Sequence, residues 1–440
     1  MFDWACQPFF TLVTTFVFAP YFAARLAPNP AEGQALWGYA TAAAGLTIAL
    51  FSPALGAVAD ETGRRKPWIA LFGVLMALAS LPLWWATPGN TAMILPVLVA
   101  FALATIGAEF AAVFNNSMMP RLVPPERLGR LSGLGWAMGY VGGLISLVLT
   151  LGFLAGSPET GKTFFGLTPL FGLDAASNAG DRIVGPLTAL WFAVFALPMF
   201  LFTPDQPATG VPMKQAFADG LASLLRTFAE VRRNANAIRF FLANMLYTDA
   251  LAALFAFGGI YAAGTFGWSA IEIGVFGILL TITGTVGALV GGRLDDAIGA
   301  RTVVAGALVV LIMAALGIVS IGPDRIGFVV AVAPPTPGDG LYASLSEQCY
   351  LALGGLIGLA AGPMQAASRS LLARIAPPEH IGQYYGLFAL SGKVTSFLGP
   401  LLVALVTDLS GSQKAGVSVL LLFFGAGLWL LAGVAVRRTA

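Results

Sequence analysis

Apolar stretches of about 20 residues recur along the whole 440-residue chain, and short loops between them hold most of its charges. A helix needs about 20 residues to cross a hydrocarbon core that is about 30 Å thick. With 58% hydrophobic and 10% charged residues, the chain has too few polar side chains to cover a water-soluble surface. The sequence therefore predicts an all-α polytopic membrane protein whose twelve spans cover residues 5–26, 36–59, 68–87, 92–117, 131–155, 183–203, 238–263, 270–292, 302–322, 347–372, 383–407 and 415–436.

The basic residues are distributed unevenly over the predicted loops. If the spans alternate in direction, most Lys and Arg residues, Arg437 and Arg438 among them, fall on the side of the N-terminus. The loops of the other side hold only Arg25, Lys162, Arg182, Arg325 and Lys414. Because cytoplasmic loops carry an excess of Lys and Arg, we expect both termini in the cytoplasm and the protein in a bacterial inner membrane. No basic residue precedes the first apolar run, so we expect this helix to stay in the mature protein.

Two loop sequences each occur twice in the chain. After span 2 the sequence is GAVADETGRRK, and after span 8 it is GRLDDAIGAR. Four residues of the first loop recur 236 positions later: Gly56, Asp60, Gly63 and Arg65 correspond to Gly292, Asp296, Gly299 and Arg301. After span 4 the sequence is RLVPPERLGRLSGL, and after span 10 it is RIAPPEHIGQYYGL, with seven matches at an offset of 253.

These offsets identify which spans correspond. Spans 2 and 4 match spans 8 and 10, so the first six and the last six spans form a parallel repeat. We therefore predict two six-helix bundles, at residues 1–203 and 238–440, joined by a cytoplasmic linker at 204–237. The repeated loops, with Arg64 included, are candidate gating loops that close one side of the protein; the alternative is that their charges only anchor the topology.

The linker has its own pattern. Its apolar residues repeat at intervals of three and four: Met213, Phe217, Leu221, Leu224, Leu225, Phe228 and Val231. This spacing predicts an amphipathic helix that lies on the inner membrane surface, and the alternative is a simple tether.

The loop GAVADETGRRK resembles the signature loop of the major facilitator superfamily. Within it the chain resembles the vacuole effluxer-like family related to autophagy, on the segments DWACQPFF, GRLSGLGWAMGYVGGLISL, YTDALAALFAFGGIYA, QAASRSLLARIAPPE and YYGLFALSGKVTSFLGPLL. The resemblance implies the major facilitator fold, alternating access and an amino-acid-like substrate. This chain departs from the family where Cys6 and Gln7 replace a usual Asn-Ser pair and Ala250 replaces a usual Gly.

Glu109, Asp249 and Lys393 fall near the middle of predicted spans, and Arg369 lies nearer the inner end of span 10. A charge at the bilayer centre costs at least about 2.5 kcal/mol, so such groups should face a cavity or each other. The resemblance places spans 1, 4, 7 and 10 around a central cavity. Our hypothesis is that Glu109 or Asp249 binds the coupling proton and that Arg369 or Lys393 binds a carboxylate or phosphate of the substrate. The alternative is a fixed ion pair, such as Glu109 or Asp249 with Lys393.

Polar residues on the same spans are further candidates for substrate binding. They are Gln7, Asn115, Asn244, Tyr247 and Gln365. For each of them, the alternative is a hydrogen bond to a neighbouring helix. Tyr140, on span 5, could also line the cavity, and its alternative is packing between helices.

Other motifs do not support an enzyme. GSPETGKT at 156–163 fits the phosphate-loop pattern, but a predicted span precedes it where a strand is required. The single histidine, His380, excludes a multi-histidine metal site. We predict a monomeric secondary transporter for a small polar solute, in contact with membrane lipids, without cofactor or nucleic acid, and coupled to H⁺ or Na⁺. The alternatives are a translocator of lipid or peptidoglycan fragments, and a membrane sensor or assembly factor that transports nothing.

Overall fold

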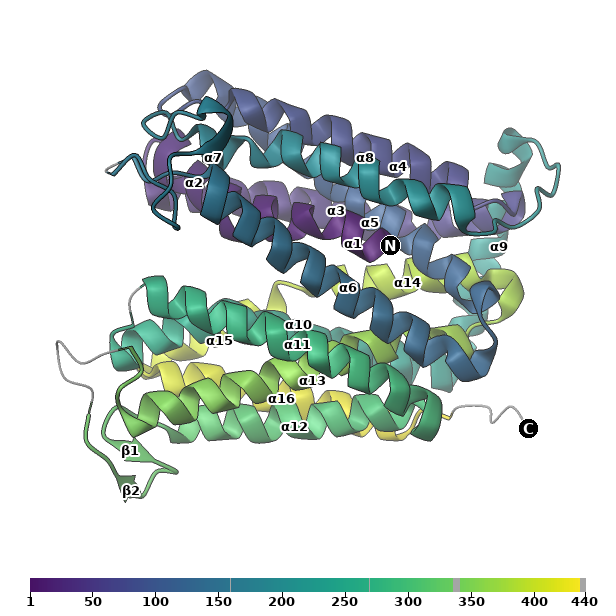
Figure 1. The fold of residues 1–440 in the computed structure, drawn as a ribbon. Coiled ribbons are helices and arrows are strands. Elements are labelled where there is room, and N and C mark those ends of the chain that lie inside the picture. Colours follow the sequence, from purple (N-terminus) through teal and green to yellow (C-terminus); the bar gives the residue numbers. More distant parts are fainter. Residues whose placement is uncertain (159, 269, 335–340, 436–440) are drawn as a thin grey trace. The chain divides into compact units, whose positions relative to one another are not determined.

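The computed structural model describes residues 1–158, 160–268, 270–334 and 341–435. Arg437 and Arg438, which we counted among the cytoplasmic charges, lie outside the described residues. Twelve helical segments of the described chain are long and apolar enough to cross a membrane, which confirms the predicted all-α polytopic fold. Figure 1 shows these helices as long, packed rods.

The first six spans contain eight α-helices: α1 (Phe2–Pro8), α2 (Phe18–Tyr21), α3 (Pro30–Thr62), α4 (Lys66–Ser80), α5 (Ile94–Leu122), α6 (Leu128–Leu149), α7 (Ala179–Arg182) and α8 (Val184–Phe202). α9 (Met213–Arg233) follows as the predicted linker helix. The last six spans contain α10 (Ala235–Phe266), α11 (Ala270–Ile298), α12 (Ala300–Ser320), α13 (Leu345–Ile375), α14 (Ile381–Lys393), α15 (Leu398–Ser410) and α16 (Gln413–Ala432). A small antiparallel hairpin, β1 (Arg325–Ile326) and β2 (Val330–Ala331), precedes α13.

Local sequence explains where several helices begin and end. α3 ends at Gly63, whose positive φ of 79° is easily adopted by glycine. α4 begins where the carboxylate of Asp205, from the linker, accepts hydrogen bonds from the backbone N–H groups of Arg65 and Lys66 at 2.9 and 3.2 Å. α13 begins with a capping box formed by Ser344 and Glu347.

Two spans are less regular than we predicted. Span 11, predicted as one helix over 383–407, is interrupted at residues 394–397 between α14 and α15. Pro400 explains the interruption, because its ring clashes with the carbonyl of Ser396, and the Ser396 hydroxyl instead donates to the carbonyl of Lys393 at 3.1 Å. Span 1 contains two π-helical segments, Phe9–Phe16 and Phe22–Leu26, on either side of α2, which contains Pro20.

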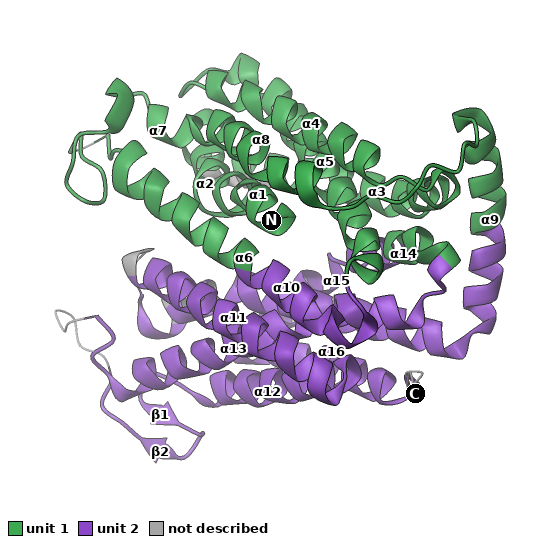
Figure 2. Ribbon diagram, turned by 45° about the vertical axis from the view of Figure 1, so that its right-hand side comes forward, with its two compact units in different colours: residues 1–122, 138–224, 379–386 green, residues 123–137, 225–378, 387–440 purple. Residues whose placement is uncertain are grey.

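The described chain forms two compact units, shown in Figure 2. Unit 1 comprises residues 1–122, 138–224 and 379–386, and unit 2 comprises residues 123–137, 225–378 and 387–440. Neither unit is one continuous segment. α6, α9 and α14 each begin in one unit and end in the other. The first turn of α6 belongs to unit 2, with helices of the second sequence repeat, and the first turn of α14 belongs to unit 1, with helices of the first repeat.

Candidate functional site

The predicted gating loop after span 2 contacts the start of α14 within unit 1. The Asp60 carboxylate, at the end of α3, accepts hydrogen bonds from the backbone N–H groups of Gly382 and Gln383 at 2.9 and 3.0 Å. Because these amides lie in the first turn of α14, the carboxylate caps that helix. A Cβ atom at Gly56 would lie 2.3 Å from the carbonyl oxygen of Gly382, so only glycine allows this approach.

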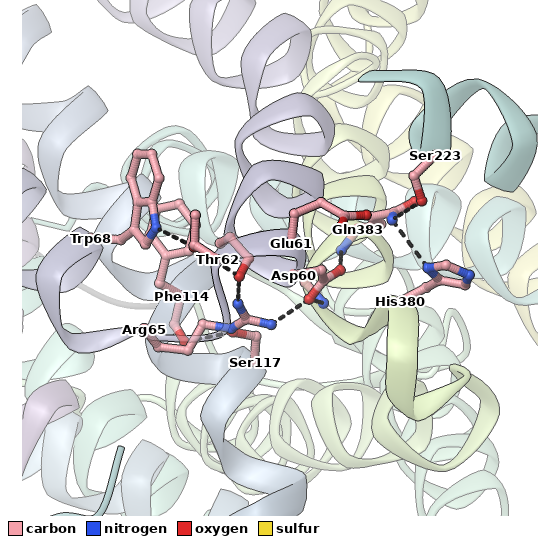
Figure 3. Close-up of polar contacts among 12 residues, drawn as sticks. Asp60, Glu61, Thr62, Arg65, Trp68, Phe114, Ser117, Ser223, His380 and Gln383 are labelled. Atoms are coloured by element: carbon pink, nitrogen blue, oxygen red, sulfur yellow. Dashed lines mark hydrogen bonds and ion pairs between the residues drawn. The ribbon is translucent and has the colours of Figure 1, made fainter. Parts of the chain in front are cut away.

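Arg65 completes this arrangement, which we call the first clasp (Asp60, Arg65, Gly382 and Gln383), shown in Figure 3. The guanidinium is 2% exposed; it pairs with Asp60 and also donates to the Ser117 hydroxyl at 3.1 Å and to the carbonyl of Ala59. Burial lowers the pKa of Arg65 from its ordinary value, and the Asp60 carboxylate acts in the opposite direction. Since an arginine stays protonated in proteins, the clasp contains a buried ion pair.

The loop after span 8 forms a matching arrangement in unit 2. The Asp296 carboxylate, at the end of α11, accepts hydrogen bonds from the backbone N–H groups of Gly129 and Arg130 at 2.8 and 3.1 Å. These amides lie in the first turn of α6. A Cβ atom at Gly292 would lie 2.7 Å from the carbonyl oxygen of Gly129, so glycine is again required for the close approach.

The cation of this second clasp (Asp296, Arg374, Gly129 and Arg130) is not the one that the repeat indicates. Arg301, in register with Arg65, is directed elsewhere and donates to the carbonyl of Val434 at 2.7 Å. Instead Arg374, from α13, pairs with the buried Asp295 and lies 3.7 Å from Asp296. Arg130 adds an exposed pair with Asp296 at 3.3 Å. The carboxylates and glycines of the two clasps therefore come from matched positions of the repeat, but their arginines come from different positions.

The remaining loop residues of the prediction take supporting positions. Gly63 and Gly299 both have positive φ, 79° and 90°, and they turn the chain between α3 and α4 and between α11 and α12. Arg64 is exposed beside the buried Arg65. Ser370 is in register with Ser117, and its hydroxyl donates to the Asp295 carboxylate. We had not selected Asp295 from the sequence.

Arg369 lies against the start of α6 in unit 2. Its Nε donates to the Ser132 hydroxyl at 2.9 Å and its Nη2 to the Ser132 carbonyl at 2.8 Å, and its guanidinium lies 6.0 Å from the Trp136 ring. The side chain is 7% exposed. Arg369 thus fixes the same segment that Asp296 caps, and a role in substrate binding stays a prediction.

Asp249, on α10, has a different environment. Its side chain is 1% exposed, and within the described chain neither carboxylate oxygen has a hydrogen-bond partner. Facing it is the hydroxyl of Thr395, in the interruption of span 11, which is also buried without a partner. A Cβ atom at Gly399 would lie 2.8 Å from the Asp249 carbonyl oxygen, so α15 packs closely on α10 here. A role of Asp249 in proton coupling stays a prediction.

Several predicted polar residues connect neighbouring helices. Asn244 donates to the Ser391 hydroxyl at 3.1 Å, and the hydroxyls of Tyr247 and Ser368 are 2.7 Å apart, all in buried positions. Gln365 donates to the carbonyl of Ala361, one turn earlier in α13, at 3.3 Å. For Asn244 and Tyr247 the structure has the helix-to-helix bonds that we gave as the alternative to substrate binding.

The other candidates lie partly buried on their helices. Gln7 of α1 lies beside α6, where a Cβ atom at Gly139 would be 3.3 Å from Oε1 of Gln7. The positions that are neither fully buried nor fully exposed are Gln7, Glu109, Asn115, Tyr140 and Lys393. For each of these residues, a role in binding the solute or the coupling proton stays a prediction.

Comparison with known proteins places the chain. The profile of a family described as "Vacuole effluxer Atg22 like" matches residues 32–440. The chain belongs to this family. It is 25% identical to the uncharacterized MFS-type transporter YxiO of Bacillus subtilis, with 99% of this chain and 93% of that protein covered. It is 24% identical to autophagy-related protein 22-1 of Neosartorya fischeri over 69% of this chain, and it spans about half the length of that fungal relative.

A solved structure shows the same fold. The major facilitator superfamily transporter FucP, in the outward conformation, matches with a TM-score of 0.70 at 16% identity, covering 99% of each chain. The predicted resemblance and the major facilitator fold are thus confirmed. The Atg22-like chain is a multi-pass membrane transporter of the MFS type.

Proposed function

We propose that this Atg22-like protein is a proton-coupled secondary transporter that moves a small polar solute by alternating access. An amino-acid-like solute is favoured by the resemblance to vacuolar exporters. FucP, which shares the fold, is a fucose:proton symporter, and it supports both a small polar solute and a proton as the coupling ion. We further propose that the protein lies in a bacterial inner membrane with both termini in the cytoplasm.

The observation that carries the proposal is the pair of clasps. In each, a carboxylate at the end of one helix holds the first turn of a helix from the other sequence repeat through two backbone hydrogen bonds. Such capping contacts are individually modest, about 0.3–2 kcal/mol, so they can form and break during a transport cycle. Alternating access requires contacts of this kind, because each side of the transporter must open once in every cycle.

Asp249 is the best-supported proton carrier. A buried carboxyl that accepts no hydrogen bond within the described chain is much cheaper to keep neutral than charged. In this arrangement the carboxyl is neutral. When a rearrangement of α10 or span 11 gives it water or a cation, it becomes charged. The carboxyl thus binds and releases one proton per cycle. The unpartnered Thr395 hydroxyl offers it one hydrogen-bond partner.

The first experiment identifies the solute. A thermal-shift screen of amino acids, small peptides and sugars on purified protein detects a ligand, because binding stabilises the native state by mass action. Radiolabelled hits are then tested in proteoliposomes, both for uptake driven by a pH gradient and for solute exchange without a gradient.

Variants then separate coupling from binding. We expect Asp249→Asn to abolish gradient-driven accumulation and to keep solute exchange, since exchange needs no net movement of protons. Asp408→Asn, which changes an exposed acid on α15, is the matched control and should behave as the wild type. Wild-type accumulation in both Asp249→Asn and Glu109→Gln would contradict proton coupling through these acids.

A further inference from the structure

α9 exposes a continuous apolar stripe although it lies outside the twelve spans. The α9 stripe consists of Met213, Phe217, Leu221, Leu225 and Phe228, each between 43% and 66% exposed. Their spacing of three or four residues places them on one side of the helix. An exposed apolar stripe of this length on a charged helix is typical of a surface that contacts something else.

An adjacent side of α9 packs on the protein at the first clasp. Gly220 lies against α3, where an added Cβ atom would be 3.0 Å from the backbone nitrogen of Val58. The Ser223 hydroxyl accepts a hydrogen bond from Nε2 of Gln383 at 3.0 Å, as Figure 3 shows. Gln383 is also the residue whose backbone N–H donates to Asp60. A displacement of α9 therefore acts directly on one of the two backbone bonds of the clasp.

The second clasp has no such connection. The repeat places Arg130 in register with Gln383, since both are the second residue held by their carboxylate. The Arg130 side chain is 65% exposed and pairs with Asp296, whereas Gln383 is fully buried beneath α9. Because the linker helix occurs once in the chain, only the first clasp is covered by it.

Position and charge identify what the α9 stripe contacts. α9 ends at Arg233, and α10, which begins a membrane span, starts at Ala235, so α9 lies at the membrane surface. Four exposed basic residues, Lys214, Arg226, Arg232 and Arg233, outnumber the two acids Asp219 and Glu230. A helix with an apolar stripe and an excess of basic residues binds the boundary between acyl chains and anionic headgroups.

We propose that the α9 stripe inserts into an anionic phospholipid leaflet and that this insertion stabilises the first clasp through Ser223 and Gln383. Insertion fixes the rotation of α9 about its axis, which presents Gly220 to α3 and Ser223 to Gln383 at the same time. In a leaflet without anionic lipid, α9 is held less firmly and the clasp opens more often. The composition of the membrane thereby sets the opening of one clasp and leaves the other unaffected.

The first experiment locates the stripe. In a background with Cys6→Ala and Cys349→Ala, single cysteines are introduced at Leu221, Leu225 and, on the polar side, Gln215, and are spin-labelled in lipid nanodiscs. We expect labels at Leu221 and Leu225 to be more accessible to oxygen than to a water-soluble nickel reagent, and the Gln215 label to show the reverse. Water-exposed labels at all three positions would overturn insertion. Labels that are shielded from both reagents, together with a co-purifying protein, would also overturn insertion and would indicate a protein partner.

The second experiment measures the coupling to the clasp. Amide hydrogen exchange at Gly382 and Gln383 is compared in nanodiscs of phosphatidylcholine alone and with phosphatidylglycerol added, so the readout does not depend on transport. We expect several-fold slower exchange with phosphatidylglycerol, and no change at Gly129 and Arg130. The double variant Leu221→Gln, Leu225→Gln and the variant Ser223→Ala should lose the lipid effect, while Gln215→Ser, on the polar side, should keep it. Equal exchange in both lipids for the wild type, or an equal lipid effect at both clasps, would overturn the proposal.

Discussion

The carboxylates of Asp60 and Asp296 make the same pair of contacts in two different parts of the chain. Each accepts hydrogen bonds from two consecutive backbone amides in the first turn of a helix, at 2.9 and 3.0 Å for Asp60 and at 2.8 and 3.1 Å for Asp296. The sequence repeat is thus expressed as a repeated contact. Its two copies can be perturbed separately, and the following predictions use that property.

Removing one carboxylate should open one clasp. Losing the charge at a helix N-terminus costs about 1–2 kcal/mol, which corresponds to about five- to thirtyfold in an opening equilibrium. Asp60→Asn should cost more than this, because it also leaves the buried Arg65 without its carboxylate. We therefore expect Asp60→Asn to accelerate amide exchange at Gly382 and Gln383, and Asp296→Asn to do so at Gly129 and Arg130. Exchange that increases at both clasps in either variant would show that the two are not independent.

The close approach of α3 to α14 should depend on Gly56. Gly56→Ala would place a Cβ atom 2.3 Å from the carbonyl oxygen of Gly382, and overpacking of this kind costs about 1–3 kcal/mol. Gly45→Ala is the matched control on the same helix, because a Cβ atom there meets nothing within 4 Å. Thermal unfolding in detergent should show a lower midpoint for the first variant only. Equal midpoints would mean that α14 shifts to accommodate the methyl group.

Arg65 and Arg301 occupy matched positions of the repeat, but Arg65 should contribute much more to stability than Arg301. Arg65→Met leaves the buried Asp60 without its cation, and breaking a buried ion pair from one side costs about 3–5 kcal/mol. Arg301→Met removes an exposed side chain bound to one backbone carbonyl, so we expect a change within about 1 kcal/mol. Chemical denaturation or thermal midpoints measured side by side check this order. A larger effect of Arg301→Met would contradict the assignment of Arg374 as the cation of the second clasp.

Arg369 and Ser132 should be energetically coupled. A hydrogen bond to a charged group contributes about 1.5–3 kcal/mol, and Ser132 accepts two from Arg369. A double-mutant cycle of Arg369→Gln and Ser132→Ala, with thermal midpoints as readout, should show non-additive effects. If Arg369 instead serves mainly to bind the solute, the two changes will be additive in stability, and only Arg369→Gln will weaken solute binding.

Asp249 should be dispensable for stability. Neither oxygen of its buried carboxyl has a partner in the described chain, so Asp249→Asn removes an unfavourable group and breaks no bond. We expect an equal or higher thermal midpoint in a variant that has lost gradient-driven transport. A markedly lower midpoint would show that the carboxyl has a structural role.

The repeat identified Gly56, Asp60, Gly292 and Asp296 as candidate gating residues, but not the helices that they contact, and its register failed for the arginines. The glycines and aspartates have small or short side chains that act close to the backbone, so matched positions make matched contacts. An arginine reaches far from its own backbone, so the partner of Asp296 depends on which guanidinium lies nearest in space. That partner is Arg374 and not the in-register Arg301.

Contacts between distant segments were outside what the sequence could predict. Arg369 and its partner Ser132 are 237 positions apart, and no pattern links them. The interruption of span 11 had a local signal, since Thr395 and Ser396 precede Pro400, but we extended the helix through it because its hydrophobicity is continuous. The bonds of Asn244 and Tyr247 to neighbouring helices were foreseen only as alternatives.

The interruption of span 11 is a point about which the rigid helix α14 can rotate. α14 ends at Lys393, and Gly382 near its other end is held by Asp60. At 1.5 Å per residue, these two points are about 17 Å apart, so a rotation of about 10° at residues 394–397 displaces Gly382 by about 3 Å. A displacement of that size exceeds the tolerance of a hydrogen bond. If Asp249 carries the coupling proton, as proposed, a small movement of Thr395 on its protonation would produce a much larger movement at the first clasp.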